Sequence, residues 1–511
     1  MLTRVLWLFG CFSLIFSNAL SAQDPLSAID WLSDSLAAPV SLPSGTAEHG
    51  AVRSALPEDV SVSDIDAPSL DGVGLLPISV TGLPRDLWGR SRSADLAGRF
   101  QFDQMDMLPA MQELLYTLLL AELDPPLDTG HGSVLFLARL DSLLALGALE
   151  KARSLLELSG QNKPALFRRA FDVSMLMHTE DEACEVLRTT PALSPTFPAR
   201  VFCLARGGDW DAAALSLETG RALGFLTEFE DALLARFLDP ILFEGDPAPR
   251  VEGHPSPLVF RMMGAIGEPL PTANLPRAFA YADLNTNSGW KAQIEAAERL
   301  VKSGALDPNR LVGLYSERRP AASGGVWDRV SAIQALDKAL KFRDVTAISQ
   351  ALPMVWEVMA LGELEVPFAR IFAHRLEGIE LNTDIQELVL NISLLAVSYE
   401  NAALTFDAKS DRQKLLVAIA QGQPGDVFSA DPTSAAIQDG FRAKGIPVRL
   451  QSLTNNHRMG EAILRAIALF ANGANGDLDE LTDALAFFRA IGLEDVARQA
   501  SLQLLLLDRR G

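Results

Sequence analysis

The sequence predicts an all-α protein built as a stack of antiparallel helix pairs, preceded by an extended and mostly irregular N-terminal arm. Three observations predict this fold. From about residue 94 onward, Leu, Ala, Phe and Met recur at the three- and four-residue spacing of amphipathic helices. Gly, Pro and Asn separate these segments, and no persistent strand pattern occurs between them. A short turn motif recurs between successive helical segments.

The first 22 residues have the layout of a secretory signal peptide. Arg4 precedes an apolar run from Val5 to Phe16, and a small-residue stretch ends at Ala22. The run is too short to remain in a bilayer, because spanning takes about 20 residues. We expect cleavage after Ala22, with Ser21 as the alternative, and export to the periplasm, since the composition is typical of a bacterial protein.

Residues 23–93 are predicted to form a short helix followed by a linker or arm. Trp31 lies within an apolar-periodic stretch long enough for about two helical turns. Beyond Ala37, prolines interrupt Ser, Asp and Gly without any helical period, which is typical of a linker. Val60–Ile65 and Val73–Val80 are apolar enough to lie as strands. The arm either docks on a partner or folds back on the body of the protein.

Residues 94–410 are predicted to be a helical-repeat solenoid, and residues 411–511 a C-terminal helical bundle or cap. A break at Gly422–Thr433 interrupts the helices of this last part. The periodicity predicts helices at 107–123, 134–146, 150–158, 165–177, 290–302, 478–490 and 495–507. Ser288 is the expected N-cap of the helix at 290–302.

A turn motif of glycine, any residue, Leu or Trp, and then Asp or Glu occurs five times. The copies are Gly147–Glu150, Gly208–Asp211, Gly304–Asp307, Gly362–Glu365 and Gly476–Asp479. Glycine adopts the left-handed conformation that ends a helix. The large apolar residue fills the space between two helices, and the carboxylate favours the positive start of the next helix. Each copy is therefore a predicted helix-to-helix turn.

With this motif the sequence resembles the tetratricopeptide-type helical repeats. In that family a glycine closes the first helix, a bulky residue follows two positions later, and an alanine sits three beyond that. Two copies match at all three positions: Gly147, Leu149 and Ala152, and Gly208, Trp210 and Ala213. Other residues replace the alanine in the remaining copies: Asn309, Pro367 and Leu481. The resemblance covers about half of the helical body and implies a superhelical α-solenoid with long concave surfaces.

Composition and charge narrow the range of partners. The 511-residue chain is 48% hydrophobic and carries a formal net charge of -21. A surface this acidic repels nucleic acid and anionic lipid, so we expect neither as a partner. No segment after the leader approaches about 18 uninterrupted apolar residues, so no integral membrane segment is expected after signal removal. A protein or peptide partner remains.

Two cysteines outside the leader flank a proline-rich turn between two predicted helices. In an oxidising compartment, Cys184 and Cys203 form a structural disulfide if their α-carbons come within about 7 Å. The alternative is two buried free thiols that act as small hydrophobic residues.

The sequence predicts no catalytic, cofactor-binding or metal-binding residues. Its six histidines are scattered, and neither a phosphate-binding loop nor a nucleophile elbow occurs. Ser288 and Lys291 match a Ser-x-x-Lys spacing without the partner motifs of penicillin-recognising enzymes. Periplasmic helical superhelices also occur in lytic transglycosylases, but at Tyr315–Glu317 the glutamate follows the serine, the reverse of their order. A peptidoglycan-acting enzyme of that type with an unrecognised active site is the alternative to a protein that is not an enzyme.

The stretch from Trp290 to Arg329 is the least leucine-rich part of the body. Aromatic residues and arginines surround a Pro/Ala/Ser/Gly loop there, a composition that binding hot spots favour. The predicted contact residues are Trp290, Tyr315, Arg318, Arg319 and Trp327, with Trp31 of the arm as a further candidate. The alternative is an inter-repeat loop whose arginines pair with nearby carboxylates. We therefore expect a periplasmic interaction scaffold, chaperone or assembly factor for a cell-envelope machine, in motility or envelope biogenesis.

Overall fold

The computed structural model describes residues 69–100, 107–130, 132–160, 163–320, 322–425, 427–429 and 431–507. Over this part of the chain the protein is all-α, as predicted: helices follow one another throughout and no strand forms. The predicted signal peptide, the predicted helix around Trp31 and the segment Val60–Ile65 lie outside the described residues.

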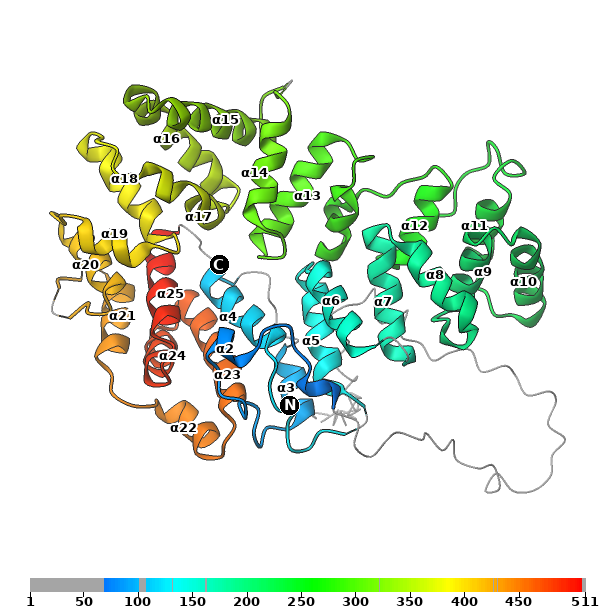
Figure 1. The fold of residues 1–511 in the computed structure, drawn as a ribbon, viewed down its shortest axis with the longest axis horizontal. Coiled ribbons are helices and arrows are strands. Elements are labelled where there is room, and N and C mark those ends of the chain that lie inside the picture. Colours follow the sequence, from blue (N-terminus) through cyan, green and yellow to red (C-terminus); the bar gives the residue numbers. More distant parts are fainter. Residues whose placement is uncertain are drawn as a thin grey trace, which may run out of the picture.

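The helices fall into three groups along the chain (Figure 1). The central group contains η2 (Leu70–Gly72), α2 (Ile78–Thr81), α3 (Ser93–Phe100), α4 (Pro109–Leu120), α5 (Val134–Ala145) and α6 (Leu149–Ser159). A lateral lobe follows with α7 (Pro164–Met177), α8 (Glu180–Thr189), η3 (Pro191–Leu193), α9 (Phe197–Arg206), α10 (Trp210–Leu223), α11 (Glu228–Leu238) and α12 (Pro257–Ala265).

The remaining helices lead back from the lobe, past the central group, and return to it. They are η4 (Thr272–Asn274), η5 (Arg277–Leu284), α13 (Trp290–Lys302), α14 (Pro308–Glu317), α15 (Val326–Phe342), α16 (Val345–Leu361), α17 (Glu365–Leu376), α18 (Thr383–Leu394), α19 (Tyr399–Thr405), α20 (Asp411–Ala420), α21 (Pro432–Arg442), α22 (Val448–Asn455), α23 (Met459–Ala474), α24 (Leu478–Ala490) and α25 (Glu494–Leu506). Each helix predicted from periodicity is present, and α13 and α24 have the predicted bounds.

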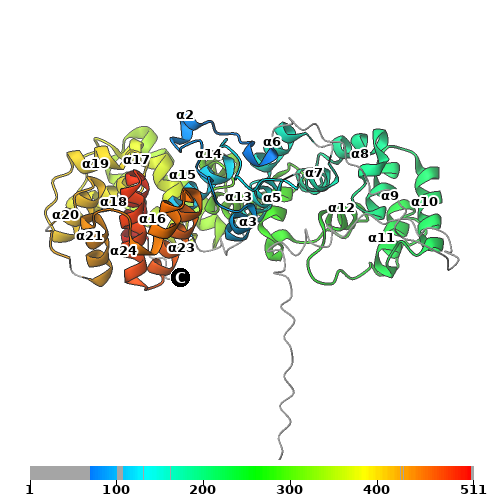
Figure 2. The same ribbon diagram turned by 90° about the horizontal axis from the view of Figure 1, so that it is seen from below.

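Within the described part of the chain, buried apolar side chains form two separate cores. The larger runs from Leu83 to Leu507, and the smaller fills the lobe between Phe167 and Met263. Helix α7 contributes to both, because alternate faces of the same helix carry Leu176 into the first and Phe171 into the second. The lobe projects from one end of an elongated molecule (Figure 2).

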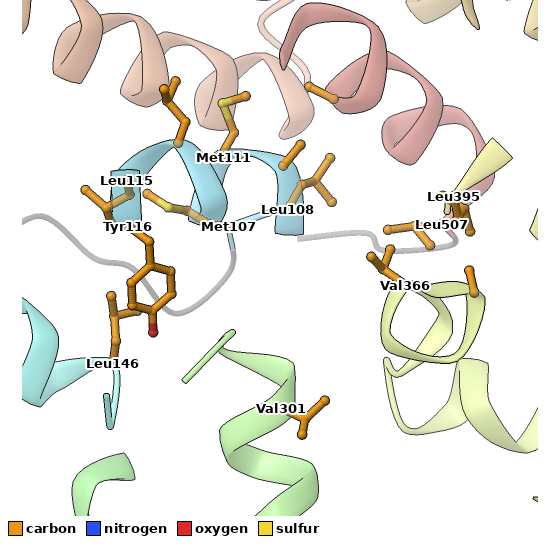
Figure 3. Packing of buried hydrophobic residues seen from close by; sticks show 14 of the residues in the cluster. Met107, Leu108, Met111, Leu115, Tyr116, Leu146, Val301, Val366, Leu395 and Leu507 are labelled. Atoms are coloured by element: carbon orange, nitrogen blue, oxygen red, sulfur yellow. The ribbon is translucent and has the colours of Figure 1, made fainter. Parts of the chain in front are cut away.

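The core does not divide near residue 410, where the sequence predicts a domain boundary. Helix α25 packs on α4, and α23 packs on α3, so the last helices complete the core of the first ones (Figure 1). The buried Ala110 N–H donates to Gln503 Oε1 at 2.8 Å. Met111 and Leu115 of α4 lie among apolar side chains from several distant elements (Figure 3).

The contact between the first and the last helices also contains charged side chains. Glu461 of α23 is 2% exposed and accepts hydrogen bonds from Arg99 of α3 and from Arg458. The Gly460 N–H donates to Leu87 O at 2.9 Å. Leu87 and Trp88 are fully buried, so this part of the predicted arm belongs to the core of the body.

The glycine of the turn motif has the predicted left-handed conformation in four of its five copies. Gly147, Gly208, Gly304 and Gly476 all have positive φ. In the fifth copy Gly362 stays in the right-handed helical region, and the positive φ falls on Glu363. The bulky residue is buried at Leu149, Leu306 and Leu364, but Trp210 is half exposed against Phe237.

Two local expectations are wrong. Val73–Val80 is not a strand: Leu76 makes one isolated bridge to Ala121, and α2 begins at Ile78. Ser288 does not cap α13, because Gly289 occupies the N-cap position and the Ser288 hydroxyl instead accepts a hydrogen bond from Asn285. An Asn285 side chain in the preceding turn competes successfully for that hydroxyl.

Candidate functional site

The predicted contact residues come from three consecutive helices that meet at one corner of the body. Trp290 opens α13 and Trp327 lies in the first turn of α15, with ring centroids 5.0 Å apart. The Trp290 indole N–H donates to Leu314 O of α14 at 3.0 Å. Both rings are partly buried, which leaves part of each at the surface. The structure therefore brings these two tryptophans together.

The two predicted arginines follow α14 and are exposed. The Arg318 guanidinium lies 3.4 Å from Glu317 Oε1. Gln334 of α15 donates to the carbonyl oxygens of Tyr315 and Arg318 and so fixes the end of α14. Arg318 and Arg319 thus extend from a rigid helix end next to the start of the α14–α15 loop. We call Trp290, Trp327, Arg318 and Arg319 the corner surface.

Tyr315 differs from the other four because it is 1% exposed. Its hydroxyl donates to Glu298 Oε1 at 2.7 Å, and Arg329 binds both oxygens of the same carboxylate, at 2.7 and 2.6 Å. Burial and the Glu298 charge hold the pKa of Tyr315 well above its ordinary value. Tyr315 is therefore a neutral packing residue that a partner cannot reach in this structure.

A polar cleft of about 640 Å³ borders the same helices, between η4, η5, α13, α15 and the end of α16. Glu298 and Arg329 line it as a pair. Arg299 donates to the carbonyl oxygens of Thr272 and Leu275, at 2.8 and 2.9 Å. Asp283 accepts from Thr272, and burial raises the pKa of Asp283. Each charged group of this cleft is held by another side chain or by the backbone, so the cleft is a structural polar seam.

His178 forms a contact between the lobe and the body. Its surroundings lead us to expect that the stability of the folded chain depends on pH. It ends α7 with a positive φ, and its Nε2–H donates to Ala282 O of η5 at 3.1 Å. Burial and then Arg261 lower the pKa of His178, although Glu180 and Asp283 act in the opposite direction. The unfolded chain therefore binds more protons than the folded chain as pH falls below about 6.5, and this contribution to stability is lost with acidification.

We expect the unfolding temperature to fall more steeply between about pH 6.5 and 5 in the parent chain than in His178→Asn, because asparagine tolerates the left-handed conformation and does not titrate. Thermal unfolding across this pH range measures it. Parallel curves for the two proteins would show that His178 does not contribute.

The lobe contains a larger hollow that the sequence analysis missed. This lobe groove has a volume of about 810 Å³ and lies between α7, α9, α11, α12 and the connection from α11 to α12. Its apolar side chains include Phe171, Phe229, Leu258, Val259 and Met262. The only sign of this groove in the sequence is the density of prolines between residues 247 and 257, which indicates a long irregular connection.

Cys184 of α8 and Cys203 of α9 form a disulfide in the structure, with their α-carbons 4.9 Å apart. The bridge closes the loop that carries Pro195, Thr196 and Pro198, all of which line the lobe groove. It therefore braces one wall of the groove.

Within the described ranges, no group of three or more His, Cys, Asp or Glu side chains is placed to hold a metal ion. None of the helices in the same ranges is long and apolar enough to cross a bilayer.

No family model matches this chain, and neither does a curated protein or a solved structure.

Proposed function

We propose that the protein is an exported, non-enzymatic interaction scaffold, chaperone or assembly factor that acts in the periplasm on a cell-envelope machine. The observation that carries the proposal is the corner surface. Two tryptophans in contact, one of them hydrogen-bonded to α14, and two exposed arginines that follow α14 have the composition of a protein-binding hot spot. A protein or peptide partner is the occupant that such a surface fits best.

We further propose that the helix pairs form a degenerate tetratricopeptide-like superhelix. Supporting this are the four motif glycines with positive φ and the three buried leucines of the motif. Curved stacks of this kind provide extended surfaces for partner proteins. The closed seam between α3–α4 and α23–α25 would then fix the curvature.

The alternative, a peptidoglycan-acting enzyme, needs a carboxylic acid that can be protonated near neutral pH. Glu298 is the glutamate next to a buried tyrosine, but the Arg329 guanidinium binds both of its oxygens. With the Tyr315 hydroxyl also bound to Oε1, both oxygens of Glu298 are occupied by protein groups and are not presented to a substrate, which argues against Glu298 as a general acid.

The test is photocrosslinking in the native periplasm, with the crosslinker placed at Arg319 and the products identified by mass spectrometry. We expect a defined protein partner, with its yield reduced at least about tenfold by Trp327→Ala with Arg318→Ala. Arg188→Ala with Arg412→Ala, which removes two exposed arginines elsewhere, serves as the control and should leave the yield unchanged. Recovery of glycan strands alone would support the enzyme instead.

A further inference from the structure

The lobe groove has the size and floor of a binding site. Its volume of about 810 Å³ lies within the range of ligand-binding clefts, roughly 300–1,000 Å³. Phe171, Leu258 and Met262 are buried in its floor, while Phe229 and Val259 are partly exposed toward it. An occupant would therefore place apolar side chains against this floor.

One wall of the groove offers a run of unpaired backbone groups. Residues 248–255 connect α11 to α12 without regular structure, and six of them line the groove. Among the described residues, no backbone N–H or C=O of this stretch takes part in a hydrogen bond, whereas Pro247 O accepts from Arg236. The part of this run before the bend at Gly253, residues 248–252, can pair with the main chain of an extended segment, in the manner of strand addition.

The rim of the groove carries free negative charge. Glu228 and Glu252 are exposed, and neither forms an ion pair within the described part of the chain. The carboxylate of Glu230 is not free, because it forms the capping box of α11 with Thr227. Arg250 and His254 also lie on the wall, so the wall is not acidic throughout. The free carboxylates favour basic side chains on a ligand.

An anionic ligand is the less favoured occupant. Helices α9, α11 and α12 begin at the groove, but Thr196, Thr227 and Ser256 already cap them. The first turn of α11 is also acidic. The positive ends of these helices are therefore largely offset where an anion would bind.

We propose that the lobe groove binds an extended peptide segment of a partner protein, with apolar residues at alternate positions and Lys or Arg at the others. This inference rests on the proposed function and names its ligand class. The segment pairs its main chain with residues 248–252, places its apolar side chains on Phe229 and Val259, and its basic side chains beside Glu228 and Glu252.

The test uses two labelled peptides of about eight residues, long enough to span the wall as a strand. One alternates Val with Lys and the other Val with Glu, and fluorescence anisotropy measures their binding to the full chain. We expect the Val/Lys peptide to bind at least about tenfold more tightly. Glu228→Lys with Glu252→Lys should remove that preference, whereas Glu244→Lys with Glu268→Lys, which makes the same charge change on exposed positions outside the groove, should keep it.

Main-chain pairing has its own test, because only alternate N–H groups of a strand face one neighbour. Methylating one alternate set of amide nitrogens in the Val/Lys peptide should weaken binding at least about tenfold, while methylating the other set should not. Equal binding of both methylated peptides to the parent chain would overturn strand pairing. Equal binding of the Val/Lys and Val/Glu peptides, or binding of neither, would overturn the groove as the site.

These outcomes are separable from failure of the proposed function. A protein partner crosslinked at Arg319 but unaffected by Glu228→Lys with Glu252→Lys, together with equal peptide binding, leaves the scaffold in place and rejects the groove. Absence of any protein partner in the periplasm, with tight Val/Lys binding in solution, rejects the scaffold and keeps a peptide site.

Discussion

Replacing Arg139 with methionine is expected to lower the free energy of unfolding by about 3–5 kcal/mol, which makes it one of the two most damaging changes we predict. Arg139 is fully buried in α5. Its guanidinium donates to the carbonyl oxygens of Leu119, Ala121 and Val73, at 2.8, 3.0 and 2.8 Å. Methionine fills the volume but leaves these acceptors unpaired in the core.

The pKa of Arg139 shows that the side chain stays charged despite its burial. Burial lowers this pKa to about 10, and the nearby Asp71 opposes the shift. At neutral pH the guanidinium therefore holds the segment after η2 onto α4 and α5 as a cation. Asp71 completes the arrangement, because its carboxylate accepts the Phe136 N–H at 2.8 Å.

Chemical denaturation followed by circular dichroism measures the effect of Arg139→Met. Arg412→Met is the matched control, because Arg412 is exposed and donates to one carbonyl, that of Leu505. We expect this control to cost less than about 1 kcal/mol. An equal loss for the two variants would mean that the buried carbonyls are satisfied in some other way.

Truncation of Trp88 is expected to cost a similar amount, about 3–5 kcal/mol for Trp88→Ala. Trp88 is fully buried at the seam, edge-on to Phe100 with ring centroids 6.1 Å apart. Its indole N–H has no acceptor among the described residues. Trp88→Phe should therefore cost less, under about 1.5 kcal/mol, because it keeps a ring and removes an unpaired donor.

Gly460 lies against the Trp88 ring and provides a second test of the same contact. A Cβ at Gly460 would lie 2.4 Å from the Trp88 ring, so Gly460→Ala should cost about 1–3 kcal/mol in the parent chain. In the Trp88→Ala background the same methyl group enters the vacated space. We expect its cost to disappear there, and a double-mutant cycle on unfolding free energies measures the coupling. Additive effects would show that the two residues do not share this contact.

The sequence predicts the local elements well because their signals are local. Three- and four-residue spacing of apolar residues predicts α4, α5, α7, α13 and α24, and the motif glycines predict where several helices end. It also predicts contact residues between Trp290 and Arg329, because aromatic residues and arginines are concentrated around one loop there. Because Cys184 and Cys203 are close along the chain, the sequence allows either a disulfide between them or two buried free thiols.

The sequence does not predict contacts between segments that are far apart along the chain. No pattern in the sequence tells that Arg139 binds carbonyls on either side of it, or that Trp88 of a proline-rich segment fills the space beside Gly460. Tyr315 reads as a surface aromatic residue until Glu298 and Arg329 are placed around it. The lobe groove likewise depends on how α7, α9, α11 and α12 converge.

By itself, the sequence determined an all-α chain, the positions of its main helices and several of its turns, because hydrophobic period and glycine conformation act within a few residues. The tertiary structure alone decided that the last helices close onto the first, that the lobe has a core of its own, and which polar groups are buried. Those outcomes depend on burial and hydrogen bonding between residues hundreds of positions apart, which leave no periodic trace in the chain.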